Sequence, residues 1–381
     1  MTGAAPSVTD AVKRDVDARI RAGRAELLGL SHRIHSHPEL AFEETRASAW
    51  VAEALDAHGL TVEHGCYGLP TAVRATVGSG PRHVGICAEY DALPDIGHAC
   101  GHNVIAAAAV GAALGLAGVA DDLGLTVTVL GTPAEEGGGG KALMLERGAF
   151  DGLDAAMMVH PAAVEMAAMP GSAVSVFDVA FRGTPAHAGA YAERGVNAAD
   201  AMTVAQVAIG LLRQQTTGTD RIQGVVSAAG TAANVIPDLS RGRWIVRTET
   251  LDGLAPLTAR VRRCFEAGAL ATGCDLELVP ACPDYADLRP DAGLLSLYRA
   301  NAEALGRTFP ALPAGGVVGA ATDMGNVSHV VPTIHPMLGL DCAAVNHQPE
   351  FTAAAVTPTA DRAVVDGAVA MAWTAVDLAV S

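Results

Sequence analysis

"HVGICAEYDALPDIGHACGHNVIAAAAVGAALGLAGVA", residues 83–120, contains a strand, a loop and a helix in succession. Residues 83–90 form an apolar run of strand length, and the alanine-rich stretch that begins near Asn103 indicates a buried helix. Two further strands are expected at 125–132 and 155–161, with a helix at 141–150 between them. Strands that alternate with helices predict a mostly parallel sheet covered on both faces.

The segments on either side of this region have a different pattern. Residues 9–33 and 44–58 have helical periodicity, and "HSHPEL" (35–40) separates them. From Val174 the expected order is strand 174–183, helix 196–215, strands 221–230 and 238–250, helix 254–269 and strand 274–280. This β-α-β-β-α-β order is typical of a ferredoxin-like domain.

The chain then returns to a helix at 291–306, a glycine-rich segment at 314–328, a strand near 333–341 and a C-terminal helix. We therefore predict an α/β fold in which a ferredoxin-like domain (174–284) is inserted between two parts of a mostly parallel-sheet domain (1–173 and 285–381).

Composition limits the classes of function. The 381 residues carry a formal net charge of −16, which argues against binding to a nucleic-acid backbone. The longest apolar stretch, Val104–Ala120, is interspersed with glycine and alanine, so no membrane span is predicted. The first 28 residues have no apolar signal core. Seven scattered cysteines do not suggest a disulfide framework, so we expect a reduced, cytoplasmic protein.

Residues able to bind a metal follow several predicted strands. In an open α/β sheet, sites form at the carboxyl ends of the strands. Four such ends offer metal-capable side chains, which are Cys100 and His102, Glu135 and Glu136, His160, and His347.

Cys100 admits three interpretations. With His102 it can form part of a metal site, because a thiolate and an imidazole suit zinc and also accept manganese, cobalt or nickel. It can instead be a nucleophile with His102 as its base, or one half of a disulfide. The scattered cysteines make the disulfide the weakest of the three.

The adjacent carboxylates in "PAEEGGGG" (133–140) have separate expected roles. Consecutive side chains of an extended segment diverge, so one carboxylate can bind a metal while its neighbour faces a substrate. A carboxylate beside a metal-activated water is suited to act as a general base.

Six segments together resemble the aminoacylase/carboxypeptidase G family of dinuclear metalloamidases. The resemblance is to the branch with indole-acetyl-amino-acid hydrolases, p-aminobenzoyl-glutamate hydrolases and β-alanyl-lysine dipeptidase-like proteins. It covers residues 30–375, and the segments are "AEYDALPDIGHACGHN" (88–103), "GTPAEEGGGG" (131–140), "MMVHP" (157–161), "FRGTPAHA" (181–188), "TAANVIPDLSRGRWIVRT" (231–248) and "ATDMGNVSHVVP" (321–332).

The resemblance implies a metallopeptidase-like catalytic domain with a lid and dimerisation domain. It implies that Glu135 is the general acid and base and that Asp91 is a carboxylate that orients a ligand. It also implies two divalent ions, zinc or manganese with cobalt or nickel as substitutes, bound by Cys100, His102, Glu136, His160 and His347.

In the lid, the resemblance implies that His187 polarises the substrate carbonyl, commonly from the partner subunit of a homodimer. Asn234 and Arg247 would hold the polar end of the substrate. Two departures from the family pattern are Asn103, where many relatives have aspartate, and the absence of a proline after His187.

The other histidines have weaker assignments. His335 is an alternative ligand to those above, and His98 is expected to support the loop. His32, His35 and His37 are given no chemistry.

The expected function is metal-dependent hydrolysis of the amide bond of an N-acyl-amino acid or of a dipeptide-like conjugate that carries a carboxylate. Slight preference goes to an unusual dipeptide, because "EYDALP" and "NHQPEFT" resemble the β-alanyl dipeptidase-like proteins. A cysteine hydrolase using Cys100 and a non-catalytic binding protein remain the alternatives. Chelation separates the first of these from a metalloenzyme, and an intact Glu135 argues against the second.

Overall fold

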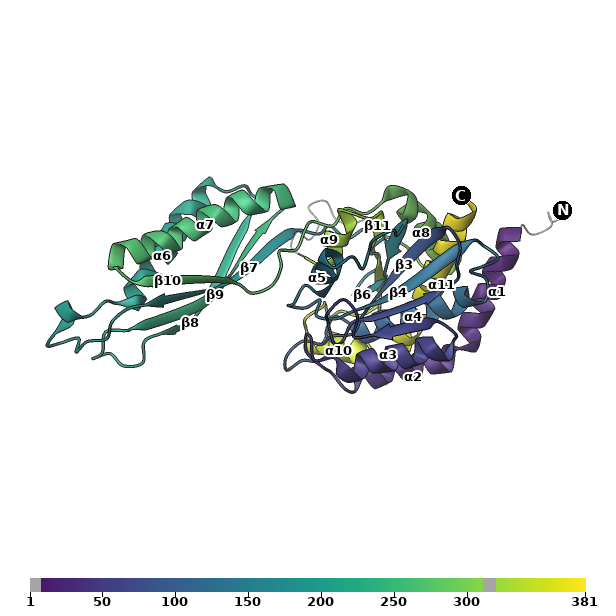
Figure 1. Cartoon of the computed structure of the whole chain (residues 1–381), viewed down its shortest axis with the longest axis horizontal. Coiled ribbons are helices and arrows are strands. Elements are labelled where there is room, and N and C mark those ends of the chain that lie inside the picture. Colours follow the sequence, from purple (N-terminus) through teal and green to yellow (C-terminus); the bar gives the residue numbers. More distant parts are fainter. Residues whose placement is uncertain (1–7, 311–319) are drawn as a thin grey trace. The chain divides into compact units, whose positions relative to one another are not determined.

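A computed structural model describes residues 8–310 and 320–381 of the chain. The described residues divide into two units, drawn in Figure 1. Unit 1 comprises residues 8–169, 288–310 and 326–381, and unit 2 comprises Pro170–Asp287 with 320–325. Unit 2 is therefore inserted into the chain of unit 1.

Unit 1 is built on a six-stranded sheet with the order β1-β2-β4-β3-β5-β11. The pairs β4–β3, β3–β5 and β5–β11 are parallel, whereas β1–β2 and β2–β4 are antiparallel. The sheet is thus mostly parallel, as predicted. Its strands are β1 (Thr61–His64), β2 (Val73–Val77), β3 (Arg82–Glu89), β4 (Leu125–Thr132), β5 (Ala155–Met157) and β11 (Thr333–Ile334).

A separate parallel pair joins β6 (His160–Ala162) to β12 (Met337–Gly339). The single strands predicted at 155–161 and 333–341 are therefore wrong. Each splits into two short strands that belong to different sheets, and His160 begins β6 instead of ending a longer strand. An unbroken apolar run shows that a segment is buried but does not show which sheet it joins.

Helices cover the sheet of unit 1 on both faces, since every residue of β3 from Val84 to Glu89 is buried. The predicted helix 9–33 is interrupted at Gly23, where a side chain would press on Leu114. The helices are α1 (Val8–Ala22), α2 (Arg24–His35), α3 (Thr45–Ala57), α4 (His102–Ala117), α5 (Gly140–Glu146), α8 (Ala292–Ala304), α10 (Pro349–Ala354) and α11 (Pro358–Val380).

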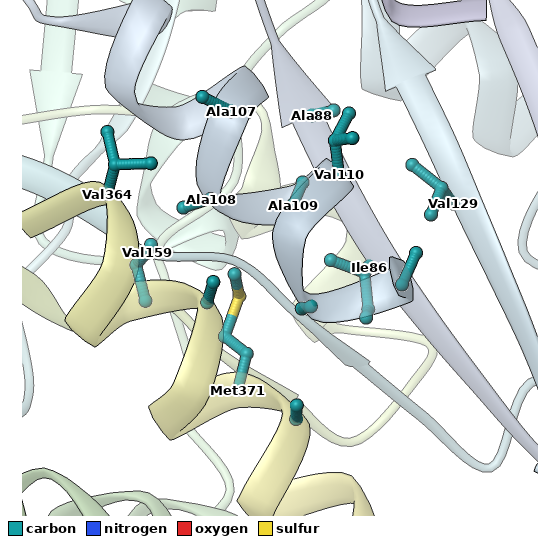
Figure 2. Packing of buried hydrophobic residues seen from close by; sticks show 14 of the residues in the cluster. Ile86, Ala88, Ala107, Ala108, Ala109, Val110, Val129, Val159, Val364 and Met371 are labelled. Carbon is teal, nitrogen blue, oxygen red and sulfur yellow. The ribbon is translucent and has the colours of Figure 1, made fainter. Parts of the chain in front are cut away.

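The core of unit 1 is centred on α4, of which 14 of 16 residues are buried. Figure 2 shows its small side chains between Ile86 of β3, Val129 of β4 and Met371 of α11. Alanine and glycine on α4 allow close helix packing, because a Cβ atom added at Gly111 would lie 2.9 Å from the Cβ of Ala368 on α11.

Among the described residues, α11 alone is long and apolar enough to cross a membrane. The sequence-based expectation that no segment spans a membrane, which considered only Val104–Ala120, stays a prediction. The helix packs against α1, α4 and α8, and 67% of its most apolar stretch is buried. This is the environment of a core helix, whose apolar surface is covered by protein.

Unit 2 has the predicted β-α-β-β-α-β order. Its four strands are antiparallel neighbours in the order β10-β7-β9-β8, and α6 and α7 pack against each other on the sheet (Figure 1). The elements are β7 (Ala173–Arg182), α6 (Ala198–Leu212), β8 (Arg221–Ala229), β9 (Leu239–Thr248), α7 (Leu251–Thr272) and β10 (Asp275–Pro280), with short 3-10 helices at Ala192–Arg194 and Arg213–Gln215.

The core of unit 2 is aromatic. The ring of Phe265 on α7 lies 4.8 Å from that of Trp244 and 6.0 Å from that of Phe177, both on strands of the sheet. The short helix α9 (Met324–Ser328) forms the end of the glycine-rich segment predicted at 314–328, of which residues 314–319 lie outside the described part.

Candidate metal centre

The donors of unit 1 come from loops that follow its strands. Cys100 lies in the loop between β3 and α4, and His102 is the first residue of α4. Between them Gly101 has a positive φ of 72°, and a Cβ atom there would press on the ring of Pro161. Glycine is therefore required at this position, where the loop passes next to the strand that carries His160.

Two groups of donors overlap at one cysteine. The potential ligand atoms of Cys100, His102 and His160 all lie within 4.8 Å of one another, and so do those of Cys100, Glu136 and His347. The five residues expected to bind metals are thus brought together, although their loops are far apart in the sequence. Cys100 belongs to both groups, as a ligand shared by two ions would.

Asp91 links two of these donors. Nδ1 of His102 donates to Oδ1 of Asp91 over 3.0 Å, and the backbone N–H of Glu136 donates to Oδ2 over 2.9 Å. Nε2 of His102 is buried and has no hydrogen-bond partner. A histidine held through one ring nitrogen, with the other free among acidic and thiol groups, fits a metal ion.

His347 is held mainly by its backbone. It has a positive φ of 69°, and its N–H donates to the carbonyl of Ala99 over 3.0 Å. Its side chain is 59% exposed, and Nε2 lies 3.4 Å from Oε2 of Glu136. The contact with Ala99 ties this histidine to the loop that carries Cys100.

The titration of the buried donors bears on the chemistry of Cys100. Burial raises the pKa of its thiol well above the usual range. Burial also lowers the pKa of His160, to about 3, so this imidazole is neutral. A protonated thiol is a poor nucleophile, whereas a bound cation would stabilise the thiolate. The metal-binding interpretation is therefore favoured over a cysteine hydrolase.

His102 differs from His160 in its charge state. Burial acts to lower the pKa of His102, but Asp91, Cys100 and Glu89 together outweigh burial, and the pKa lies well above its usual value. Binding of a divalent ion at this imidazole would release its proton.

Glu135 lies beside the donors, with Oε2 3.9 Å from Nε2 of His102. The turn before it is held by Glu44, which sequence reasoning missed. Ala134 has a positive φ of 60°, and its N–H donates to Oε1 of Glu44 over 2.8 Å. Thr71 donates to Oε2 over 2.9 Å. Glu44 is fully buried, and burial followed by the charge of Asp91 raises its pKa to about 7.

A buried ion pair next to His102 was also missed. Nζ of Lys141 lies 2.5 Å from Oε1 of Glu89, and neither side chain is exposed. Burial acts to raise the pKa of Glu89, but the positive charges of Lys141, His102, His160 and His335 together outweigh burial and lower the pKa to about 2. The signal in the sequence was a single charge within each of two buried segments, "HVGICAEY" and "GGGGKALML".

His98 and His335 are buried but belong to none of the donor groups found among residues 8–310 and 320–381. The His335 ring lies 5.3 Å from that of His160, and the His98 ring lies 6.1 Å from that of His35. Burial lowers the pKa of His335 to about 4 and that of His98 to about 3, so both are neutral.

The expected lid residues all lie in unit 2. His187 and Asn234 are exposed neighbours, since the N–H of Ala188 donates to the carbonyl of Asn234 over 3.0 Å. Arg247 is half-buried on β9, where its cross-strand partner is Arg221, and burial lowers its pKa. Two arginines side by side provide positive charge suited to a carboxylate.

Residues 85–364 match peptidase family M20/M25/M40. The chain is also 39% identical to the Xaa-Arg dipeptidase of Mus musculus, over 96% of this chain and 89% of the mouse protein. A p-aminobenzoyl-glutamate hydrolase subunit of Escherichia coli (strain K12) is 29% identical over 72% of this chain and 62% of its own.

The chain belongs to peptidase family M20/M25/M40. This confirms the family predicted from the motifs, and the protein is accordingly a metal-dependent hydrolase of amide bonds.

Solved structures agree with the M20 fold. A dinuclear metal-binding M20 peptidase of Bacillus subtilis is 22% identical, with a TM-score of 0.70 over 94% of this chain and 99% of that one. The aminobenzoyl-glutamate utilization protein of Klebsiella pneumoniae is also 22% identical, with a TM-score of 0.72 over 92% of this chain and 98% of that one. Both support the α/β fold with an inserted domain.

Proposed function

We propose that this M20 protein is a dipeptidase with two divalent ions per chain. The observation that carries the proposal is the pair of donor groups that share Cys100. The ligands would be Cys100, His102, Glu136, His160 and His347. A thiolate, three imidazoles and one carboxylate suit zinc or manganese, with cobalt or nickel as substitutes. When bound, such ions lower the pKa of a water and polarise an amide carbonyl.

Glu135 is the proposed general base and acid. Its carboxylate lies beside Nε2 of His102 at 3.9 Å and is 9% exposed, so it borders the donor groups while retaining some access to solvent. It would take a proton from the attacking water and deliver it to the departing amine. Asp91 would fix the ring of His102 and the backbone of Glu136 throughout, through the two hydrogen bonds described above.

Unit 2 is the proposed lid, and it would also form the interface of a homodimer. His187 would polarise the substrate carbonyl from its own or the partner subunit, and Asn234 would bind the polar end of the substrate. Arg247, next to Arg221, would bind its carboxylate. Such contacts hold the amide bond in position for attack.

The proposed substrates are dipeptides with a free carboxylate, with N-acyl-amino acids as the second class. The dipeptide class is favoured because the relative with 39% identity is an Xaa-Arg dipeptidase. A basic carboxy-terminal residue is therefore the first substrate type to examine. A reduced compartment such as the cytoplasm is the proposed location, because the seven cysteines are scattered along the sequence and do not suggest a disulfide framework.

The test is metal analysis of the purified protein, with assays of Xaa-Arg, Xaa-Lys and β-alanyl dipeptides and N-acyl-amino acids before and after chelation. We expect about two ions per chain and release of free amino acid that stops on chelation and returns with added metal. Cys100→Ser should lose both metal and activity, whereas Cys66→Ser, at a buried cysteine outside the donor groups, should keep both. Full activity in metal-free protein would refute the proposal.

A further inference from the structure

The buried ion pair Glu89–Lys141 lies next to the donor residue His102. Glu89 ends β3, and Lys141 stands in the first turn of α5, directly after four glycines. A Cβ atom at Gly140 would overlap the carbonyl oxygen of Pro133, so glycine is needed for α5 to begin against this loop. The glycine run is thus followed at once by Lys141, whose ammonium group pairs with Glu89 next to His102.

Glu89 lies where its carboxylate could bind a metal ion. Its Oε2 lies 3.4 Å from Nε2 of His102, the buried ring nitrogen that has no hydrogen-bond partner. Ligand atoms of Glu89, His102 and Glu135 lie within 4.8 Å of one another and form a third donor group. This group competes with the Cys100 groups, because His102 belongs to it as well.

We propose that Lys141 acts as a fixed cation that keeps Glu89 from binding metal and so selects the Cys100-containing donor groups. The inference rests on the proposed dinuclear centre. The ammonium lies 2.5 Å from Oε1 of Glu89 and would repel a divalent ion that approaches the same carboxylate. Without it, Glu89 would add a hard oxygen donor and a further negative charge to a site that already contains Glu135 and Glu136.

Lys141 is a positioning residue in this proposal and touches neither substrate nor reacting atoms. A purely structural ion pair would affect stability when broken, because one buried charge would be left without its partner. If Lys141 keeps Glu89 from binding metal, breaking the pair would in addition change the metal affinity of the protein and the ligand field of the bound ion. Metal binding therefore distinguishes the two roles independently of activity.

The experiment uses metal-stripped protein titrated with cobalt(II), followed by calorimetry and by the visible and thiolate-to-cobalt absorption bands. Lys141→Met should bind cobalt about tenfold more tightly or better, with altered visible bands, because a repelling charge is lost and a carboxylate is gained. The double variant Glu89→Gln/Lys141→Met has no such charge imbalance and should bind cobalt with wild-type affinity and spectrum. Lys13→Met breaks the ion pair of Lys13 with Asp377, away from the donors, and is the control.

Wild-type affinity and spectrum in folded Lys141→Met would overturn the inference. If that variant does not fold, the double variant decides. Wild-type binding there supports the inference, and a tenfold loss would show that Glu89 is itself a ligand and overturn it. If the wild-type protein binds no cobalt, the proposed dinuclear centre itself is contradicted. This result is distinguishable from a failure of the inference about Lys141, in which the wild-type protein binds cobalt and Lys141→Met binds it equally well.

Discussion

Substitution of Glu44 by glutamine should make unfolding of the protein less sensitive to pH. Glu44 precedes α3 and is fully buried, and its carboxylate accepts hydrogen bonds from two backbone N–H groups and from Thr71. Glutamine is isosteric and can keep the bonds to the backbone through its carbonyl oxygen, and its amide can donate to the hydroxyl of Thr71. The substitution therefore removes a titrating group with little change in packing.

The expected effect follows from the pKa of Glu44, which is raised from 4.5 to about 7. Between these two pH values the native state binds the proton that the unfolded chain has released, so the free energy of unfolding falls as pH rises. One pKa unit corresponds to about 1.4 kcal/mol. Relative to wild type, Glu44→Gln should therefore gain about 1 kcal/mol at pH 5 and about 3 kcal/mol at pH 8.

The assay is urea unfolding of metal-free wild type and Glu44→Gln at pH 5, 6, 7 and 8. Glu53→Gln, at an exposed carboxylate of α3, is the matched control and should follow the wild-type profile. Parallel pH profiles for wild type and Glu44→Gln would show that the native Glu44 carboxyl does not titrate near neutrality, and the reasoning from burial would be refuted.

Three further predictions concern catalysis and the lid. Glu135→Gln should keep both metals by elemental analysis while kcat falls by about 10²–10⁴-fold, and loss of metal with retained turnover would contradict the assigned role. Arg247→Ala should raise KM for a dipeptide by about tenfold or more, whereas Arg241→Ala on the same strand should not. Phe265→Ala should lower the free energy of unfolding of unit 2 by about 3–5 kcal/mol, measured by urea titration followed through the fluorescence of the adjacent Trp244.

Much of the fold could be predicted because local patterns specify it. The strand at 125–132 and the βαββαβ order of unit 2 have clear periodicity and match the structure. The segment 155–161 could not be resolved, because its pairing with β3 and β11 at one end and with β12 at the other depends on distant strands. Gly23 shows the same limit, since the side chain that a Cβ atom there would meet, Leu114, lies on another helix.

The candidate site was predictable to a similar degree. Strand ends and motifs indicated the side chains expected to bind metals, and the structure brings their potential ligand atoms together in two groups, each with its atoms within 4.8 Å of one another. The sequence did not reveal the roles of Glu44, Glu89 and Lys141. Each of these side chains interacts with a residue that is remote in the sequence. A buried charge is stable only when it is paired or neutralised, and the sequence does not show which residue supplies the partner.

The insertion of unit 2 has a consequence for synthesis of the protein. The apolar helix α4 is made early, but α11, which packs against it, is made only after the whole of Pro170–Asp287. The strands and helices of unit 2 are nearly continuous in sequence, so they can fold while unit 1 still lacks its later part. A nascent chain therefore carries an uncovered α4 surface for the time needed to translate more than a hundred residues. We therefore expect the yield of active protein to fall when the synthesis of residues 358–380 is delayed, because an uncovered apolar surface promotes aggregation.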